Sequence, residues 1–385
     1  MITLLPCFDL ARLVDGQLVT GTHTPGSLIP SWAVTNLVGN SSVRVCSGAN
    51  IGFYDEQLAV LTDDGRILAK RKPVRDRLDD ITPIVQDLFG ADAANIQGIH
   101  VTERHLFVWS YSAVGVIHLG TNGVLLPVYR RQFPSEIDLI SVSEFYCLVK
   151  TRDNRLFDTM LAIYPGQSLL IDEKSELAFH DVDSVTKIYT SGSWILLLMD
   201  NGKVYGCENK GTLLAKRPLA RIQLPEDEVV VKIVDAREYI IYVTSAGNCY
   251  RQDTNGMGDW SAPVLVREVR GHVENVVAIC NNYIVVQCSN SSSLKTYRMR
   301  FYTYMGVSIV ETVPLPALDG MTVIAITRQA MHTCFVTNEG SVFWSYSLLG
   351  AEPVITRDPF FDSNLLAVEC NAAKIRSAGS LLKNR

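Results

Sequence analysis

The stretch LVDGQLVTGTHTPGSLIP, residues 13–30, sets out a pattern that returns along the whole chain. An apolar run ends at Asp15 and Gly16, a second apolar run follows, and glycines and a proline come after it. Close variants are MDNGKVYGCENKGTLL at 199–214 and VTNEGSVFWSYSLLG at 336–350. Two short apolar runs around a tight polar turn are typical of a β-hairpin.

The hairpin recurs at a nearly constant period. Its turns contain Asp, Asn, Ser or Gly, which suit hairpin turns because Gly and Asn tolerate positive φ. Successive turns lie 39 to 50 residues apart, with a mean of about 46. A period in the forties with one hairpin per unit is typical of a four-stranded propeller blade. The turn residues that anchor the units are Gly16, Gly65, Gly115, Asn154, Gly202, Gly247, Ser292 and Gly340.

A further apolar run precedes most hairpins, as expected of an inner strand that is buried on both faces. Helical periodicity is nearly absent, and residues 81–96, in the longest gap between hairpins, predict one short helix. The runs that predict inner strands begin at residues 43, 96, 185, 229, 276 and 322.

The ends of the chain predict how the ring closes. Residues 365–371 form an inner-strand pattern with no hairpin after it, and the first hairpin has no evident inner strand before it. Joining these two segments in one blade would close the ring and hide two sheet edges. The sequence therefore predicts an all-β protein with a single β-propeller of seven or eight blades over residues 1–371. A short basic tail follows at 372–385.

Composition limits the class of protein. The chain has 385 residues, of which 47% are hydrophobic and 19% charged, so it can bury a large core. Its net charge of -5 gives no reason to expect nucleic acid as a partner.

Nine cysteines, scattered without zinc-ligand spacing, indicate buried reduced thiols. The start of the chain is a poor signal peptide and no membrane span is predicted, which favours a cytoplasmic or cytoskeletal location, with the nucleus as the alternative.

No catalytic, cofactor-binding or metal-binding constellation stands out. The phosphate-loop, nucleophile-elbow and zinc-protease motifs are absent from the sequence. His332 and Cys334 would share one face of a strand, but a core cysteine beside a histidine is the simpler interpretation. The carboxylate pairs at 63–64 and 79–80 fall in turn or loop contexts, where solvated acids are ordinary. The sequence therefore predicts a protein that is not an enzyme.

The residues around the turns form a motif that resembles a known repeat. The phrase Asp/Asn-Gly-x-hydrophobic, followed by spaced glycines and a leucine, occurs as DGQLVTGTHTPGSL at 15–28 and NGKVYGCENKGTL at 201–213. The last unit, EGSVFWSYSLLG, keeps part of it. This resembles the repeat of the regulator of chromosome condensation family, whose propellers usually have seven blades. Neither the WD-repeat nor the kelch signature occurs in the chain.

That resemblance implies several different roles, since fold alone does not fix function. Family members exchange guanine nucleotide on the small GTPase Ran, act within ubiquitin ligases, bind the cytoskeleton or cilia, or inhibit bacterial enzymes. The short, degenerate repeats here match no exchange residue and leave little length for the wedge of an exchange factor. The leading hypothesis is a non-enzymatic protein-binding scaffold, a subunit of a larger intracellular assembly of the cytoskeletal or ciliary kind. The alternative is an exchange factor for a Ran-like GTPase.

Two stretches are candidates for partner binding. The segment AKRKPVRDRLDD, residues 69–80, is predicted either to keep an edge solvated or to dock an acidic partner. Tubulin, an acidic scaffold subunit and a small GTPase are partners of that kind. In RQDTNGMGDW at 251–260, Trp260 either packs between blades or anchors a partner, because tryptophan is enriched at interface hot spots. The cations of the first stretch are Lys70, Arg71, Lys72, Arg75 and Arg77.

Overall fold

The computed structural model describes most of the strands and the connections between them. The described residues are 2–4, 11–14, 17–22, 31–34, 43–51, 55–70, 78–102, 105–119, 125–143, 146–160, 176–190, 194–208, 219–224, 228–236, 239–253, 261–269, 272–280, 283–290, 293–304, 307–329, 332–346, 353–359 and 368–370. The predicted tail at 372–385 lies outside this part of the chain, as do Gly16 and Ser292.

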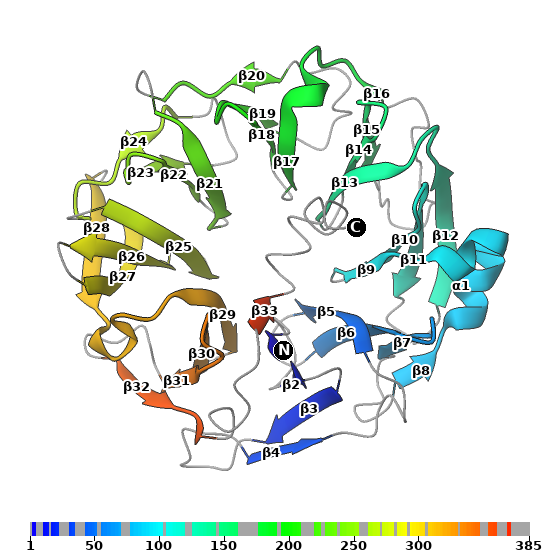
Figure 1. Cartoon of the computed structure of the whole chain (residues 1–385), viewed down its shortest axis with the longest axis horizontal. Coiled ribbons are helices and arrows are strands. Elements are labelled where there is room, and N and C mark those ends of the chain that lie inside the picture. Colours follow the sequence, from blue (N-terminus) through cyan, green and yellow to red (C-terminus); the bar gives the residue numbers. More distant parts are fainter. Residues whose placement is uncertain are drawn as a thin grey trace.

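The strands form eight sheets arranged in a ring (Figure 1). Seven sheets have four strands and one has five, and within every four-stranded sheet the strands follow one another in chain order. Neighbouring strands of these sheets are antiparallel, as in the β5–β6–β7–β8 sheet. This is an all-β propeller, and among the described residues its ring contains eight blades, one of the two predicted numbers.

The four positions in each blade are given by the strand order from the centre outward. The first strands are β1 (Ile2–Leu4), with β33 (Val368–Cys370) on its central side, and the innermost strands β5 (Val43–Ile51), β9 (Gly98–Val101), β13 (Ile137–Val142), β17 (Val185–Thr190), β21 (Val230–Asp235), β25 (His272–Cys280) and β29 (Val323–Gln329). The second strands are β2 (Ala11–Val14), β6 (Asp55–Thr62), β10 (His105–Trp109), β14 (Tyr146–Thr151), β18 (Trp194–Met199), β22 (Tyr239–Thr244), β26 (Tyr283–Asn290) and β30 (His332–Thr337).

The outer half of each blade is completed by two further strands. The third strands are β3 (Gln17–Thr22), β7 (Ile67–Lys70), β11 (Ala113–Leu119), β15 (Leu156–Met160), β19 (Val204–Glu208), β23 (Cys249–Asp253), β27 (Ser293–Tyr304) and β31 (Val342–Tyr346). The fourth strands are β4 (Ser31–Val34), β8 (Leu78–Asp80), β12 (Leu125–Gln132), β16 (Glu176–Leu177), β20 (Ala220–Arg221), β24 (Val264–Leu265), β28 (Val307–Pro314) and β32 (Val354–Arg357). Every run predicted as an inner strand occupies an innermost position.

Most turns between second and third strands share one geometry. In the β6–β7 turn the amide of Thr62 donates to the carbonyl of Arg66, and the amide of Gly65 donates to the carbonyl of Thr62. The same pair of bonds recurs in the turns at 151–155, 199–203, 244–248 and 337–341. The residue that precedes the last position of each turn is held at positive φ, which favours glycine or asparagine. These residues are Gly65 (82°), Asn154 (59°), Gly202 (74°), Gly247 (79°) and Gly340 (85°).

Gly115 is an exception, because it does not lie in a turn. It sits within β11, opposite Val108 of β10. A Cβ atom at this position would lie 2.5 Å from a ring carbon of Phe89 and 2.8 Å from a methyl group of Leu88. The sequence prediction of a turn at Gly115 is therefore wrong. Its small size lets the helix described next approach the strand closely.

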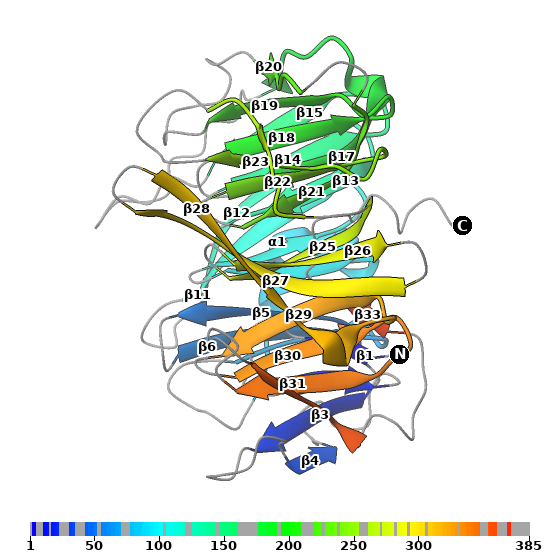
Figure 2. The same ribbon diagram turned by 90° about the vertical axis from the view of Figure 1, so that its left-hand side faces the viewer.

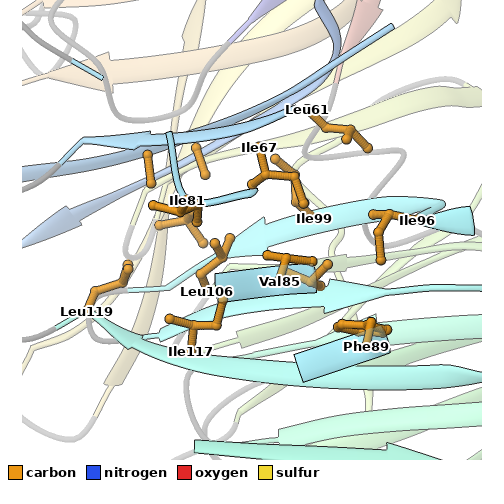
Figure 3. Close-up of a cluster of buried hydrophobic side chains, with 14 of the residues drawn as sticks. Leu61, Ile67, Ile81, Val85, Phe89, Ile96, Ile99, Leu106, Ile117 and Leu119 are labelled. Carbon is orange, nitrogen blue, oxygen red and sulfur yellow. The ribbon is translucent and has the colours of Figure 1, made fainter. Parts of the chain in front are cut away.

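The predicted helix lies between the second and third blades. It comprises α1 (Thr82–Phe89), which begins with a proline in its first turn, and the 3₁₀ helix η1 (Gly90–Asn95). Val85 and Phe89 of α1 are buried in a cluster with side chains of β6, β7, β9, β10 and β11 (Figure 3). The helix therefore fills the space between these two sheets. The labelled members of the cluster are Leu61, Ile67, Ile81, Val85, Phe89, Ile96, Ile99, Leu106, Ile117 and Leu119.

The two ends of the described chain meet in the five-stranded sheet. Its order is β33-β1-β2-β3-β4, with β33 spanning Val368–Cys370. As predicted, residues from both ends share one blade. The expectation that the first hairpin has no inner strand of its own is wrong, because β1 (Ile2–Leu4) occupies that position. The strand β33 is an inner strand, as predicted, but it is a fifth strand on the central side of β1 and pairs with it in parallel.

Polar contacts link successive blades near the starts of the inner strands. The Lys150 ammonium of β14 lies 3.1 Å from a carboxylate oxygen of Asp138 and 3.2 Å from the carbonyl oxygen of Val185 in the next blade. In a later pair of blades Lys232 donates to Asn275, at 2.7 Å. The ring is thus held by hydrogen bonds between sheets as well as by apolar packing.

One hairpin extends beyond the others. The strands β27 and β28 pair from Tyr297 and Pro314 out to Tyr304 and Val307, and their far ends project at one side of the ring (Figure 2). The expectation from the repeat lengths, that little chain is left for a protrusion, does not hold for this blade.

Candidate functional site

The topology separates two faces of the ring. In an antiparallel four-stranded blade, the second-to-third turn lies at the same end as the start of the first strand and the end of the fourth. These turns and the connections between blades therefore share one face, here called the turn face. The opposite face carries the first-to-second and third-to-fourth connections.

Exposed carboxylates are distributed over the turn face. Asp63 and Glu339 lie in second-to-third turns, and Asp183 and Glu268 precede inner strands. All of them are exposed, and within the described part of the chain none has an ion-pair partner. They belong to different blades, so negative charge extends around the ring rather than gathering at one point. With Asp200, the exposed unpaired carboxylates used below are Asp63, Asp183, Asp200, Glu268 and Glu339.

Several cations on this face are neutralised by neighbouring acids. The guanidinium of Arg66 lies 3.0 Å from Asp64, and that of Arg152 lies 2.5 Å from Glu136. The ammonium of Lys295 lies 2.9 Å from Asp319. Such exposed pairs contribute little to stability, but they leave the unpaired carboxylates to set the local potential. Lys203 and Arg267 are exposed cations that offset it in part.

Exposed apolar side chains lie among these charges. Tyr111 lies between β10 and β11 and is 41% exposed, and Val229 precedes β21 and is 40% exposed. An aromatic ring on a polar surface is a common anchor in protein interfaces. The turn face therefore combines negative charge with apolar contact points, as a docking surface for a protein requires.

The sequence-predicted binding stretches begin on the opposite face. Lys70 ends β7 and pairs with Leu78 of β8, and this pair marks the third-to-fourth connection of the second blade. The Lys70 side chain and residues Arg71, Lys72, Arg75 and Arg77 lie outside the described part, as does Trp260, which falls between Asp253 and Ser261. The roles predicted for these residues therefore stay predictions.

Five cysteines whose side chains the structure describes are buried. They are Cys147, Cys207, Cys249, Cys288 and Cys334. Burial, and after it the neighbouring Cys288, raises the pKa of Cys249 to about 12. Burial, and after it Glu274, raises the pKa of Cys288 to about 11. Because the thiolate is the nucleophile, raised pKa values make these thiols unreactive at neutral pH.

The described residues offer few other chemical features. Cys334 is buried, and its register partner is Trp344, whose indole nitrogen donates to Asp358 at 2.8 Å. The His332 side chain lies outside the described part. No group of three or more His, Cys, Asp or Glu side chains that could hold a metal occurs among the residues searched. None of the described helices is long and apolar enough to span a membrane.

Sequence reasoning missed the acidic turn face. The turns were predicted from their glycines and Asn154, but the threonine that begins four of the five turns was not used as a signal. Thr62, Thr151, Thr244 and Thr337 occupy that position, and the amides of Arg66 and Asn248 donate to the hydroxyls of Thr62 and Thr244. Threonine followed three residues later by Gly or Asn would have located these turns, and with them the acids that share a face.

Comparison with known proteins finds only distant similarity to solved structures. No protein-family model and no curated protein matches the chain. The solved structure of human WBSCR16 is 14% identical and is aligned over 69% of this chain and 82% of its own, with a TM-score of 0.46. Yeast RCC1 (Prp20), solved bound to Kap60, is 12% identical over 78% of this chain and 80% of its own, with a TM-score of 0.46. BamB from Moraxella catarrhalis is 10% identical over 89% and 92%, with a TM-score of 0.43.

Similarity this low says nothing about what the chain binds. The class to which it belongs is the β-propeller, and that assignment rests on its own eight sheets. The predicted relation to the regulator of chromosome condensation family stays a resemblance of its repeats.

Proposed function

We propose that the chain is a non-enzymatic scaffold that binds another protein, as a subunit of a larger assembly, and that the turn face takes part in the binding. The observation that carries this proposal is the set of exposed carboxylates around that face that have no ion-pair partner among the described residues, with Tyr111 and Val229 among them. Their charge favours a basic segment of the partner, because complementary potentials steer encounter and fix register.

A charge-neutralised variant tests the proposal. Asp63→Asn, Asp200→Asn and Glu339→Gln remove three negative charges without removing a described ion pair. Surface changes of this kind usually alter stability by no more than about 0.5 kcal/mol. The partner is first identified by affinity capture from native extract and then purified. Its association rate with the variant is expected to fall at low salt and to converge with the wild-type rate at high salt.

A matched control uses the same face. Lys203→Gln and Arg267→Gln remove positive charge there, and the association rate is expected to rise. Equal rates for wild type and both variants would show that the turn face is not the docking surface. Nucleotide release from a Ran-like GTPase, measured with the same preparation, tests the alternative of an exchange factor.

A further inference from the structure

The interface between the seventh and eighth blades differs from the one before it. The seventh blade comprises β25–β28, and the eighth comprises β29–β32. Val285 of β26 packs in one cluster with Phe335 and Phe343 of the eighth blade, which shows the sheet faces that meet there. Val285 is the register partner of Arg298, and Tyr283 is the register partner of Arg300, so all four share the face that meets the eighth blade.

Cationic side chains stack on aromatic rings on that face. Arg298 is 1% exposed, lies 5.8 Å from the ring centroid of Tyr283, and pairs with Glu311 at 3.0 Å. Arg300 lies 5.3 Å from the ring of Tyr283 and 4.9 Å from that of Tyr302. Its Nε atom is buried and has no hydrogen-bond partner within the described residues. Arg300 is itself half-buried, so the cluster reaches the surface.

Hydroxyl groups occupy the facing positions of the eighth blade. Thr333 and Ser345 are register partners and lie two residues from Phe335 and Phe343, so they share their face. Both residues are 0% exposed. Neither hydroxyl has a hydrogen-bond partner within the described residues. A buried polar group without a partner is destabilising, so two such hydroxyls on paired residues point to a ligand that would satisfy them.

The preceding interface shows what these positions hold when they are filled by protein. Arg251 of the sixth blade corresponds in register to Arg298, and it pairs with Asp253 at 3.1 Å. The facing pair there, Ile284 and Met299, is apolar and fully buried. Phe301 also covers Arg251, with its ring centroid 5.2 Å from the guanidinium.

Two changes distinguish the later interface. Arg300 stands where the sixth blade has Asp253, so a carboxylate is replaced by a second guanidinium. The hydroxyl pair stands where the seventh blade has Ile284 and Met299. Both changes favour a small anion, since they add positive charge and hydrogen-bond donors while removing negative charge and apolar volume.

We propose that the interface between the seventh and eighth blades binds a tetrahedral oxyanion of the phosphate or sulfate type. Arg300, which is half-buried, supplies positive charge and a hydrogen-bond donor to the oxyanion. The buried hydroxyls of Thr333 and Ser345 donate hydrogen bonds to it. Arg298, which is paired with Glu311, adds positive potential. A bound oxyanion links two neighbouring sheets and so stabilises the ring.

Inorganic phosphate and the full chain provide the test. Thermal unfolding and calorimetry are measured in phosphate and in chloride of equal ionic strength. The wild-type melting temperature is expected to rise saturably with phosphate, because a ligand that binds only the folded state stabilises it. Arg300→Gln is expected to weaken phosphate binding by about tenfold or more, and Ser345→Ala by less.

Arg66→Gln serves as a matched control, because it removes a guanidinium on the turn face. It is expected to leave phosphate binding unchanged. Arg300→Lys, which keeps the charge, guards against loss of the fold and is expected to retain partial binding. Phosphate that acts no better than chloride on the wild type would overturn the proposal. Equal phosphate binding by the wild type and Arg300→Gln would overturn it as well.

Discussion

Ile2 and Val368 are register partners in two parallel strands, at opposite ends of the described chain. Their strands β1 and β33 complete the five-stranded blade and join the first part of the chain to the last. Closure of this kind removes a free sheet edge. The stability of the ring should therefore depend on both segments.

Truncation tests this dependence. A chain that ends at residue 367 lacks β33 and is expected to melt at a lower temperature than wild type. Deletion of residues 1–21 removes β1, β2 and most of β3 and is expected to abolish cooperative unfolding. A chain that ends at residue 371 keeps both strands and is the control. Thermal unfolding followed by circular dichroism checks all three, and a wild-type melting curve for the first two would refute the closure.

Lys150 is a second test of how the blades are joined. Its side chain is 6% exposed and contacts both Asp138 and the carbonyl of Val185 in the next blade. Lys150→Met leaves an acid and a carbonyl without their donor, and we expect a loss of about 2 to 4 kcal/mol in the free energy of unfolding. Arg152→Met breaks an exposed pair with Glu136 and should lose no more than about 1 kcal/mol. Urea denaturation measures both, and equal losses would argue against a special role for Lys150.

The turn glycines provide a matched pair of substitutions. Gly65 and Gly202 both have positive φ, so alanine at either position is strained by about 1 to 2 kcal/mol. A Cβ atom at Gly65 would meet nothing within 4 Å, whereas one at Gly202 would lie 2.3 Å from a methyl group of Val229. Gly202→Ala is therefore expected to lose about 1 to 3 kcal/mol more than Gly65→Ala. Denaturant titration of the two variants compares them directly, and a smaller loss at Gly202 would contradict the packing described here.

Alkaline pH should weaken the fold through its buried thiols. Burial raises the pKa of Cys288 from 9.0 to about 11 and that of Cys249 from 9.0 to about 12. Well below pH 9 both thiols are neutral in the folded and unfolded states. As the pH rises from about 9 towards about 11, the unfolded thiols lose protons first, so the free energy of unfolding falls.

Removing the two thiols isolates their part of this dependence. The double variant Cys249→Ala and Cys288→Ala should show a shallower decline between pH 9 and pH 11, although it is less stable overall. The slope of stability against pH, measured by urea denaturation, separates the two effects. Identical slopes for the wild type and the double variant would rule out a contribution from these cysteines.

The basic stretch predicted from the sequence is tested by charge reversal. Changing Lys70, Arg71, Lys72 and Arg75 to glutamate should slow association with an acidic partner at low salt, because exposed charges act mainly on the encounter rate. The difference should shrink at high salt as screening shortens their reach. Stopped-flow association kinetics with a captured partner measure both quantities. Unchanged rates and salt slopes would remove the stretch as a docking site and leave Trp260 as the next candidate.

The propeller could be predicted from the sequence because its evidence is local and repeated. Each hairpin carries its own turn residues and apolar runs, and the period fixes the number of strands per unit. The same reasoning failed at Gly115, because a glycine serves equally well in a turn and beneath a close-packed ring such as that of Phe89. It also missed β1, because a three-residue strand is too short to show periodicity.

The candidate sites are formed by residues that are distant in the sequence, so no local sequence motif predicts them. Asp63 and Glu339 share a face only because their turns lie at the same end of two blades that are far apart in sequence. Arg300 faces Thr333 and Ser345 only because of the strand register in each of two different sheets. A single sequence carries no signal for register between sheets, so neither site could be found before the fold was known.

The parallel pairing of β1 with β33 also sets an order of events during synthesis. Proteins are translated from the N-terminus at about 5 to 20 residues per second, so the middle blades can fold while the ribosome is still adding residues. The strand Ile2–Leu4 emerges first, yet its neighbour on the side toward the centre of the ring is not made until residue 370 has been added. Throughout that interval the nascent chain carries an unpaired strand edge, which is the state in which chaperones would be expected to hold it.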